Sequence, residues 1–74
     1  SSMDDISKLL YCLERLPEFC ANVFRLRFWG ENGFPMNDEQ IASEVNLGSA
    51  QAVATKFNRH GCWKKIRDCY FGNN

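Results

Sequence analysis

Residues 37–61 constrain the fold of this chain most, because they carry the start and stop signals of two short helices separated by a tight turn. Asn37 can accept hydrogen bonds from the free N–H groups of a helix start, and Gln40 follows at the spacing of a capping box. Asn46 tolerates the left-handed conformation in which many helices end. The pattern predicts one helix from Asn37 to about Asn46, a turn of three or four residues, and a second helix capped by Ser49.

The second helix, at residues 49–60, has an apolar inner face and a polar outer face. Val53 and Phe57 are four residues apart and face inward, and Gly61 marks the end of the helix. The side chains that lean outward are Gln51, Ala54, Thr55, Asn58 and Arg59. Two helices joined by a short turn, with a polar and basic face on the second, are typical of a helix-turn-helix that enters the major groove of DNA.

Two segments before this pair have the spacing of helices and are expected to support it. In residues 4–16 apolar side chains recur every three or four positions, with Asp4 or Asp5 as the cap. The residues of the expected inner face are Ile6, Leu9, Leu10, Leu13 and Leu16. Pro17 is tolerated at a helix start. Residues 18–29, which are apolar around most of the circumference, should therefore form a second helix, the central and most buried one.

The segment 62–71, CWKKIRDCYF, places Trp63, Ile66 and Tyr70 at helical spacing. It forms either a short last helix packed on the first helix or an extension of the second helix of the pair. A chain of 74 residues makes a single domain, here residues 1–74. The sequence therefore predicts an all-α fold, a four- to five-helix bundle that contains a helix-turn-helix.

The charges of the chain are balanced in number but not in position. Nine acidic and nine basic residues give a net charge of zero. Residues 1–44 hold eight acidic and four basic residues, whereas residues 45–74 hold one acidic and five basic residues. A polyanion such as DNA would therefore meet the second part. No apolar run approaches the roughly 18 residues of a membrane span and no leader pattern opens the chain, so we expect a cytoplasmic protein, at the nucleoid if it binds DNA.

The four cysteines are Cys12, Cys20, Cys62 and Cys69, which could pair as two disulfides or, with His60, bind a metal ion. The spacing favours neither, because there is no CxxC pair and the gaps do not match those of zinc fingers or ribbons. A cysteine beside apolar helix neighbours packs as a small hydrophobic side chain. We therefore expect buried thiols, no metal and no cofactor.

The sequence gives little support to catalysis. His60 is the one histidine, and no nucleophile stands at a helpful spacing from it. No glycine loop of the kind that cradles phosphates is present. We expect His60 to lie at a helix end near the negative end of the dipole. The chain is therefore expected to be no enzyme and to have no small-molecule substrate.

Four pieces of the sequence stand in an order that resembles region 4, the DNA-binding region of bacterial sigma-70-family factors. They are Leu13-x-x-Leu16-Pro17-Glu18, VFRLRF at 23–28, DEQIA at 38–42 and SAQAVATKFNR at 49–59, and together they span nearly all of the chain. In that family the Leu-Pro step separates two helices and the last piece is the recognition helix. The stretch from Ile41 to Gly61 is also similar to the Myb-related helix-turn-helix of GcrA-type bacterial regulators.

The two resemblances differ in the turn. In the sigma pattern Asn46 holds the customary glycine position and Gly48 falls later, so the turn is one residue longer and the register of the recognition helix is open by one residue. In the GcrA-type pattern the stretch aligns without a gap. The Leu-Pro and VFRLRF pieces belong to the sigma pattern, which is therefore kept first.

The sigma resemblance implies two macromolecular partners. One is double-stranded DNA, with the recognition helix at about 49–60 in the major groove of a promoter −35-like element. The other is RNA polymerase, through the flap of its β subunit, or another transcription protein, contacted by the first two helices. A sigma factor also melts the −10 element with domains that this chain lacks, so the resemblance implies one domain of such a factor or a small accessory regulator.

Within the DNA interpretation, each outward side chain has a chemical role. Gln51 and Asn58 suit adenine, and Thr55 suits the methyl group of thymine. Ser49, Lys56 and Arg59 would bind phosphates. The basic side chains of segment 62–71 would add salt-dependent affinity. The predicted DNA-binding residues are Ser49, Gln51, Thr55, Lys56, Asn58, Arg59, Lys64 and Lys65.

The alternative function is a helical protein-interaction module that has the helix-turn-helix shape but does not read DNA. It is supported by an excess of large apolar residues over what a small core can cover: Trp29, Phe34, Trp63, Tyr70 and Phe71. An exposed apolar patch of this kind would mark a partner surface.

Overall fold

The structure is a computed structural model that describes residues 2–72, and of Ser2 and Met3 it describes the backbone alone. This part of the chain contains five helices and no strand. The helices are α1 (Ser2–Glu14), α2 (Glu18–Phe28), α3 (Asp38–Glu44), α4 (Ala50–Arg59) and α5 (Cys62–Tyr70). The predicted all-α class is therefore confirmed.

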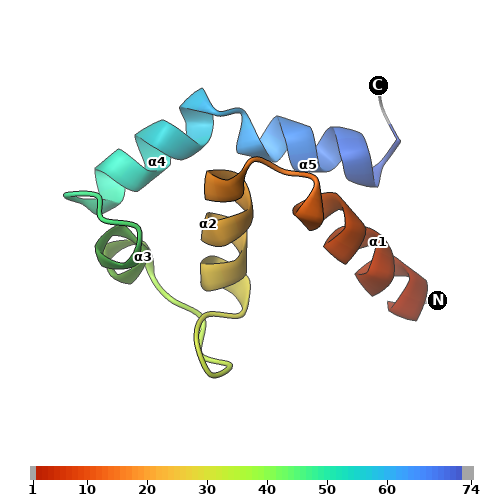
Figure 1. Cartoon of the computed structure of the whole chain (residues 1–74), viewed down its shortest axis with the longest axis horizontal. Helices are drawn as coiled ribbons and strands as arrows, with labels where there is room; N and C mark the ends of the chain where they lie inside the picture. Colours follow the sequence, from red (N-terminus) through yellow and green to blue (C-terminus); the bar gives the residue numbers. More distant parts are fainter. Residues whose placement is uncertain (1, 73–74) are drawn as a thin grey trace.

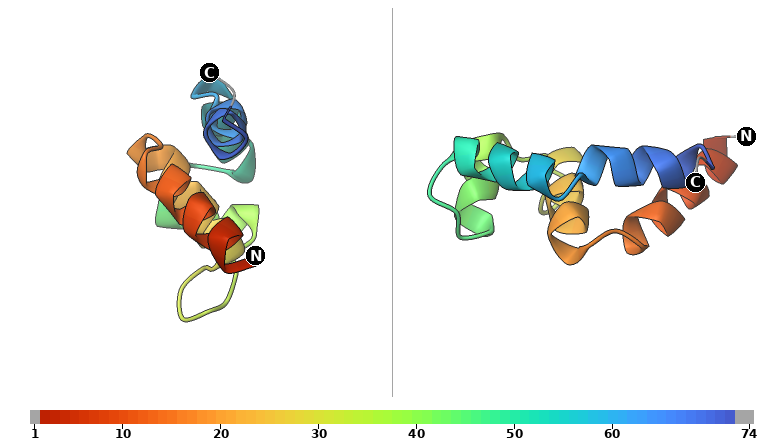
Figure 2. Two further views of the ribbon diagram at one scale, coloured as in Figure 1. Left: turned by 90° about the vertical axis from the view of Figure 1, so that its right-hand side faces the viewer. Right: turned by 90° about the horizontal axis from the view of Figure 1, so that it is seen from above.

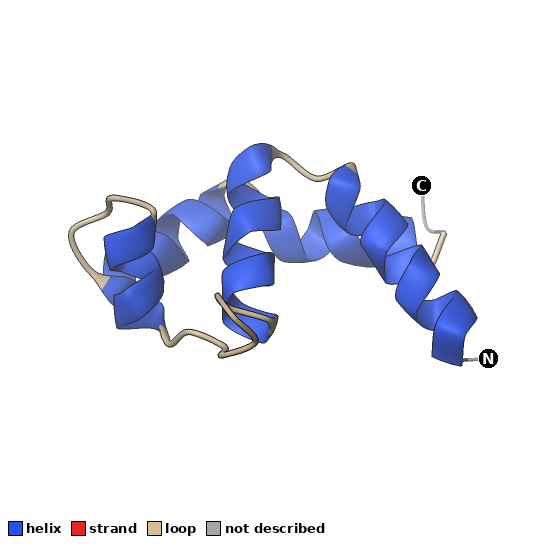
Figure 3. Cartoon of the chain, turned by 60° about the horizontal axis from the view of Figure 1, so that its bottom comes forward, coloured by secondary structure: helices blue, strands red, loops and turns tan. Residues whose placement is uncertain are grey.

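The five helices are arranged around α2. In Figure 1, α3 and α4 lie on one side of α2, while α1 and α5 lie on the other. The view coloured by secondary structure shows the same division (Figure 3). The molecule is flat, with extents of 37 × 28 × 14 Å. Figure 2 shows α4 and α5 following one another along the long axis. The helices therefore form one flat layer with two broad, solvent-exposed faces.

The predicted central helix is found in α2. It begins directly after Pro17 and ends at Phe28, one residue before the predicted end, with Trp29 as its C-cap. Its side chains Val23 and Phe24 are buried, and the helix contacts α1, α3 and α4. Phe24 is the centre of an aromatic group, because its ring lies edge-on to those of Phe57 and Trp63. The apolar circumference of α2 thus joins the two sides of the molecule into one core.

The inner face predicted for α1 is only partly correct. Leu13 is buried, and Leu9 and Leu16 are partly buried against the core. Ile6 and Leu10, in contrast, keep 57% and 47% of their surface exposed. The reason is the direction of α1, which diverges from α2 toward the N-terminus (Figure 1). Its apolar stripe therefore continues past the edge of the core.

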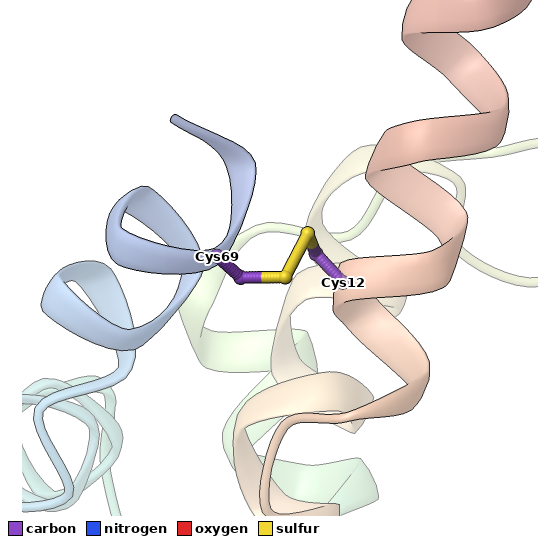
Figure 4. Close-up of a disulfide and its surroundings, with 2 residues drawn as sticks. All are labelled: Cys12 and Cys69. Atoms are coloured by element: carbon purple, nitrogen blue, oxygen red, sulfur yellow. A yellow bond between two sulfur atoms is a disulfide. The ribbon is translucent and has the colours of Figure 1, made fainter. Parts of the chain in front are cut away.

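The four cysteines form two disulfides, so the expectation of free buried thiols is wrong. Cys12 of α1 is bonded to Cys69 of α5, with the Cα atoms 5.8 Å apart (Figure 4). Cys20 of α2 is bonded to Cys62 at the start of α5, with a Cα separation of 5.4 Å. Both separations are ordinary for a disulfide. The two cysteines of each bridge are 57 and 42 positions apart in the sequence. They meet because α5 folds back on α1 and α2, and the local cysteine spacings do not predict that arrangement.

The last segment is a separate helix, which decides between its two predicted forms. Gly61 adopts the left-handed conformation with φ +64°, and this breaks the path from α4 to α5. Cys62 and Ile66 of α5 are buried. The helix packs on α1 as well as on α4, which is the first of the two alternatives.

The connection from α2 to α3 is a tightly built loop. Asn32 and Gly33 both have positive φ, and the N–H of Phe34 donates to the carbonyl of Glu31 over 3.1 Å, as in a type I′ turn. A Cβ on Gly30 would lie 1.6 Å from the carbonyl oxygen of Phe34. The loop therefore requires glycine at this position.

Candidate nucleic-acid interface

The first helix of the predicted pair, α3, begins with the expected capping box. The Oδ1 atom of Asn37 accepts from the N–H of Gln40, and the N–H of Asn37 donates to Oε1 of Gln40, each over 2.9 Å. Ile41 and Ala42 are buried and attach the helix to the core. Because both its start and its inner face are fixed, α3 is a firm support for the helix that follows.

The turn between α3 and α4 is short and closed by hydrogen bonds. Val45 caps the end of α3 and Ser49 caps the start of α4, which leaves residues 46–48 between the caps. Asn46 has φ 60°, the predicted left-handed conformation, and the N–H of Leu47 donates to the carbonyl of Ala42 over 2.8 Å. The three-residue turn, the left-handed Asn46 and the Ser49 cap therefore agree with the sequence prediction, whereas α3 ends at Glu44 with Val45 as its C-cap, earlier than the predicted end near Asn46.

The outward residues of α4 lie on one continuous arc. At about 100° per residue, Gln51, Thr55, Asn58 and Arg59 fall within a sector of about 100°, and all four are exposed. The opposite face is buried through its apolar side chains, as predicted. Within the arc, Nε2 of Gln51 donates to Oγ1 of Thr55 over 3.3 Å. The arc therefore presents two amides, a hydroxyl and a guanidinium side by side.

Two of the three α4 residues predicted to contact phosphates, Ser49 and Lys56, are engaged within the protein. The hydroxyl oxygen of Ser49 accepts from the N–H of Ala52 over 3.1 Å as the cap of α4. Lys56 is half-buried, with its Nζ 4.5 Å from the centre of the Phe19 ring. Arg59 is exposed and makes no ion pair within residues 2–72. Of the three, Arg59 is the side chain best placed to reach a phosphate.

An open hollow of about 500 Å³ lies beside the arc. Five of the eight predicted residues line it: Ser49, Gln51, Thr55, Lys56 and Arg59. The lining also includes Leu47, Ala52 and His60, which the sequence analysis did not propose. Leu47 lies in the turn between α3 and α4, and His60 is the C-cap of α4, at the helix end where the sequence analysis expected it.

The remaining predicted residues lie outside this hollow. Asn58 is on the arc but not in the lining. Lys64 and Lys65 are exposed on α5, the neighbouring helix. Lys64 forms an ion pair with Asp68 over 2.6 Å, which reduces the charge it offers to a partner. The structure thus separates the eight residues into a group on α4 and its turn and a pair on α5.

Acidic residues gather on a different part of the surface. Glu31 and Glu44 line the same hollow between α2, α3 and the loop that joins them. A hydrogen bond from Glu44 to Glu31, together with the repulsion between the two charges, raises the pKa of Glu44. The exposed arc of α4 carries no acid. A polyanion would therefore meet less repulsion at α4 than at the acidic side of α3.

No group of three or more potential metal ligands is close enough to hold an ion in the part of the chain that the structure describes. The four cysteines are used by the disulfides. Among residues 2–72, no helix is both long enough and apolar enough to cross a membrane.

Comparisons with protein-family models, with curated proteins and with solved structures find no significant match to this chain. The likeness to sigma region 4 therefore depends on the residues that carry it, and the functional argument depends on the geometry of α3, α4 and their turn.

Proposed function

We propose that this protein is a DNA-binding transcription domain that inserts α4 into the major groove of a promoter element similar to the −35 element. The observation that carries the proposal is the exposed arc of Gln51, Thr55, Asn58 and Arg59 on a helix whose start is capped and whose opposite face is buried. A side chain reads a base edge only when its backbone is held in place. The capping box of α3 and the three-residue turn supply that support.

Each residue of the arc has a specific role in this proposal. Gln51 and Asn58 form paired hydrogen bonds with adenine, and Thr55 contacts a thymine methyl group. Arg59 binds a phosphate near the C-terminal end of α4, and Ser49, about 15 Å away at the other end of the helix, donates its hydroxyl hydrogen to a second phosphate while its oxygen stays in the cap. Lys64, Lys65 and Lys56 contribute through charge and make the affinity depend on salt.

The proposal includes a second partner, because a domain with so few basic side chains binds DNA weakly by itself. Attachment to a larger assembly raises the effective concentration of the domain at its site. Following the sigma resemblance, RNA polymerase is that assembly and α1 and α2 form the contact. The protein then acts at the nucleoid in the cytoplasm.

Disulfides persist in oxidising compartments and are rare in the cytosol, so a protein at the nucleoid would hold its four cysteines as thiols and would have to keep α3 and α4 folded without the two bridges. The arc of α4 contains no cysteine, and both bridges join α5 to α1 or α2. DNA binding therefore requires the caps and the packing of α3 and α4, and the proposal expects the same DNA affinity with and without reductant for as long as these two helices stay folded.

The proposal is tested with a pool of random-sequence DNA duplexes. Selection on the oxidised chain should enrich one motif of a few base pairs, and fluorescence anisotropy should give an affinity that falls as salt rises. With about three phosphate contacts the slope of log K against log salt is about −3. Replacing Gln51, Asn58 and Arg59 by alanine should abolish the preference for the motif.

The matched control combines Ser43→Ala and Lys8→Ala, which change exposed residues on α3 and α1 away from the arc. This variant should keep the motif preference. If the α4 variant binds the selected duplex as tightly as the wild type, the assignment of the groove-reading helix is wrong.

The alternative function, a protein-interaction module, is favoured by one observation. Four large apolar side chains remain substantially exposed on α2, the following loop and α5, namely Phe28, Trp29, Phe34 and Trp63. In that case selection on random-sequence DNA should enrich no motif, while charge changes on α1 and α2 should still abolish capture of polymerase. Unchanged capture of polymerase by these variants would contradict it.

A further inference from the structure

An apolar groove runs between α1, α2 and α5, away from the arc of α4. It consists of two hollows of about 360 Å³ and 430 Å³ that share Leu13 and Trp29 in their linings. Leu10 belongs to the first hollow, and Phe28 and Trp63 belong to the second, whose lining is entirely apolar. No residue of this groove lines the hollow beside α4. It is a separate surface.

The exposed part of this groove has the size of the apolar centre of a protein interface. The exposed fractions are 47% for Leu10, 53% for Phe28, 42% for Trp29 and 45% for Trp63. These fractions leave on the order of 400 Å² of contiguous apolar surface, given the area of aromatic side chains. An interface of standard size has about 450 Å² of apolar area on each partner.

The same groove contains one unpaired charge of each sign. Glu14 and Arg25 line the first hollow together with Leu10 and Trp29, and both are exposed. Neither makes an ion pair within residues 2–72, and the guanidinium of Arg25 donates to Asn22. A surface with an acid and a base beside one apolar centre is complementary to itself when a two-fold axis runs through the apolar centre between the two charges.

We propose that this groove binds a second copy of the chain and forms a two-fold symmetric dimer. The apolar side chains of the two grooves pack on each other, Glu14 of each copy pairs with Arg25 of the other, and the arcs of α4 remain free. Charge pairs of this kind fix the register of an interface more than they strengthen it. A polymerase contact through α1 and α2 would replace the second copy, so the dimer is the form of the free chain.

This proposal does not depend on DNA binding, because it concerns a different surface. Its first test is analytical ultracentrifugation of the oxidised chain from about 1 to a few hundred micromolar. The wild type should pass from monomer to dimer in this range. The two tryptophans of the chain, Trp29 and Trp63, both line the groove, so their emission should shift to shorter wavelength as the dimer forms.

A pair of neighbouring residues gives a matched comparison. Leu10 and Tyr11 are both exposed and adjacent on α1, but only Leu10 lines the groove. The Leu10→Asp variant should raise the dissociation constant of the dimer at least tenfold, and the Tyr11→Asp variant should leave it unchanged. Because both positions are outside the core, neither change should unfold the chain. Equal dissociation constants for the two variants would overturn the proposal.

A charge exchange tests whether the partner is the chain itself. Glu14→Arg and Arg25→Glu should each be monomeric, because like charges then face each other across the axis. An equimolar mixture of the two should dimerise, since opposite charges are restored in both contacts. A mixture that stays monomeric overturns the proposal. A wild type that is monomeric at a few hundred micromolar also overturns it, even if that monomer binds polymerase or lipid vesicles through Leu10. None of these outcomes changes the DNA affinity of α4, which is measured separately.

Discussion

The two sides of α2 are held together in different ways. On one side, α3 and α4 each begin with a side-chain cap, and their apolar residues Ile41 and Val53 are completely buried. On the other side, α5 begins at Gly61 without a side-chain cap and is bonded covalently to α1 and α2. The first side is held by local signals and packing, and the second side is held by packing together with two covalent bonds.

This difference separates the two surfaces that the protein offers. The α3–α4 side covers its apolar residues Ile41 and Val53 and exposes polar ones, and it is the side to which the proposed function assigns DNA. The α1–α5 side leaves Ile6, Leu10 and Trp63 substantially exposed, which suits contact with a protein. Such a surface contributes little to the stability of the isolated chain, so the disulfides have to supply what packing does not.

The largest expected effect is the loss of the buried disulfide. Replacing Cys20 and Cys62 by alanine should lower the free energy of unfolding by about 4 kcal/mol, because a long loop is no longer closed in the unfolded chain. Urea denaturation followed by circular dichroism measures this change. The Cys12–Cys69 bridge spans 57 positions against 42, which changes the loop term by only about 0.3 kcal/mol. Replacing Cys12 and Cys69 should cost less, because Cys69 is only partly buried and leaves a smaller cavity.

Hydrogen exchange should then locate the change within the molecule. In the Cys12→Ala/Cys69→Ala variant, amides of α1 and α5 should lose protection while those of α3 and α4 keep it. Equal urea midpoints with and without reductant would show that the two sides do not differ as argued.

The second effect compares the same side chain on the two sides. Ile41 is fully buried in α3, whereas Ile6 keeps 57% of its surface exposed in α1. Ile41→Ala should cost about 2 to 5 kcal/mol because it leaves a cavity. Ile6→Ala should change the stability of the monomer by less than about 0.5 kcal/mol. Thermal unfolding at low concentration checks both, and a large loss for Ile6→Ala would mean that α1 packs more closely than described.

A smaller effect tests the local signals of the α3–α4 side. Asn37→Ala removes one half of the capping box and should cost about 1 kcal/mol. Asn58→Ala is the matched control, because Asn58 is exposed on α4 and alanine is the better helix former there. Denaturant titration should place Asn37→Ala below the wild type and Asn58→Ala at or slightly above it; the reverse order would rule out a stabilising role for the cap.

The smallest effect is a dependence on pH at the end of α3. Glu31 raises the pKa of Glu44 above its ordinary value of 4.5 through a hydrogen bond and charge repulsion. A carboxyl with a raised pKa binds its proton more tightly in the folded chain, so its stabilising contribution is present below pH 4.5 and is lost as the pH rises through the raised value. Relative to the wild type, Glu44→Gln should therefore gain stability over that range.

Thermal unfolding at a series of pH values, with Glu39→Gln on the same helix as the control, measures this difference. Parallel pH profiles for the wild type and Glu44→Gln would exclude an interaction between the two carboxyl groups.

The sequence predicted the parts of the fold that depend on near neighbours. Asn37, Asn46 and Ser49 act on backbone groups within a few residues, and all three have the predicted conformation or bond. The outward arc of α4 follows from the helical period in the same way. The exposure predicted for Gln51, Thr55, Asn58 and Arg59 is therefore confirmed, while their contact with DNA remains a prediction.

The errors concern distant contacts. The cysteine pairs depend on where α5 lies relative to α1 and α2, and the spacings within the sequence contain no record of that. The spacing of apolar residues in α1 predicted burial correctly for Leu13 but wrongly for Ile6 and Leu10. The spacing identifies one face of a helix, but it contains no information on how far the helices packed against that face extend. Lys56 was expected to be available to a phosphate and instead lies over Phe19, a contact between helices far apart in the chain.

The two bridges are nested, since the pair Cys20–Cys62 lies within the span of the pair Cys12–Cys69. A protease that cuts once at any bond between Cys20 and Cys62, including the exposed loop at 31–35, leaves two fragments that are still joined by both bridges. The nicked protein would migrate as one species until a reductant is added. Backbone continuity in the middle of the chain is therefore not required to keep the helices in one molecule.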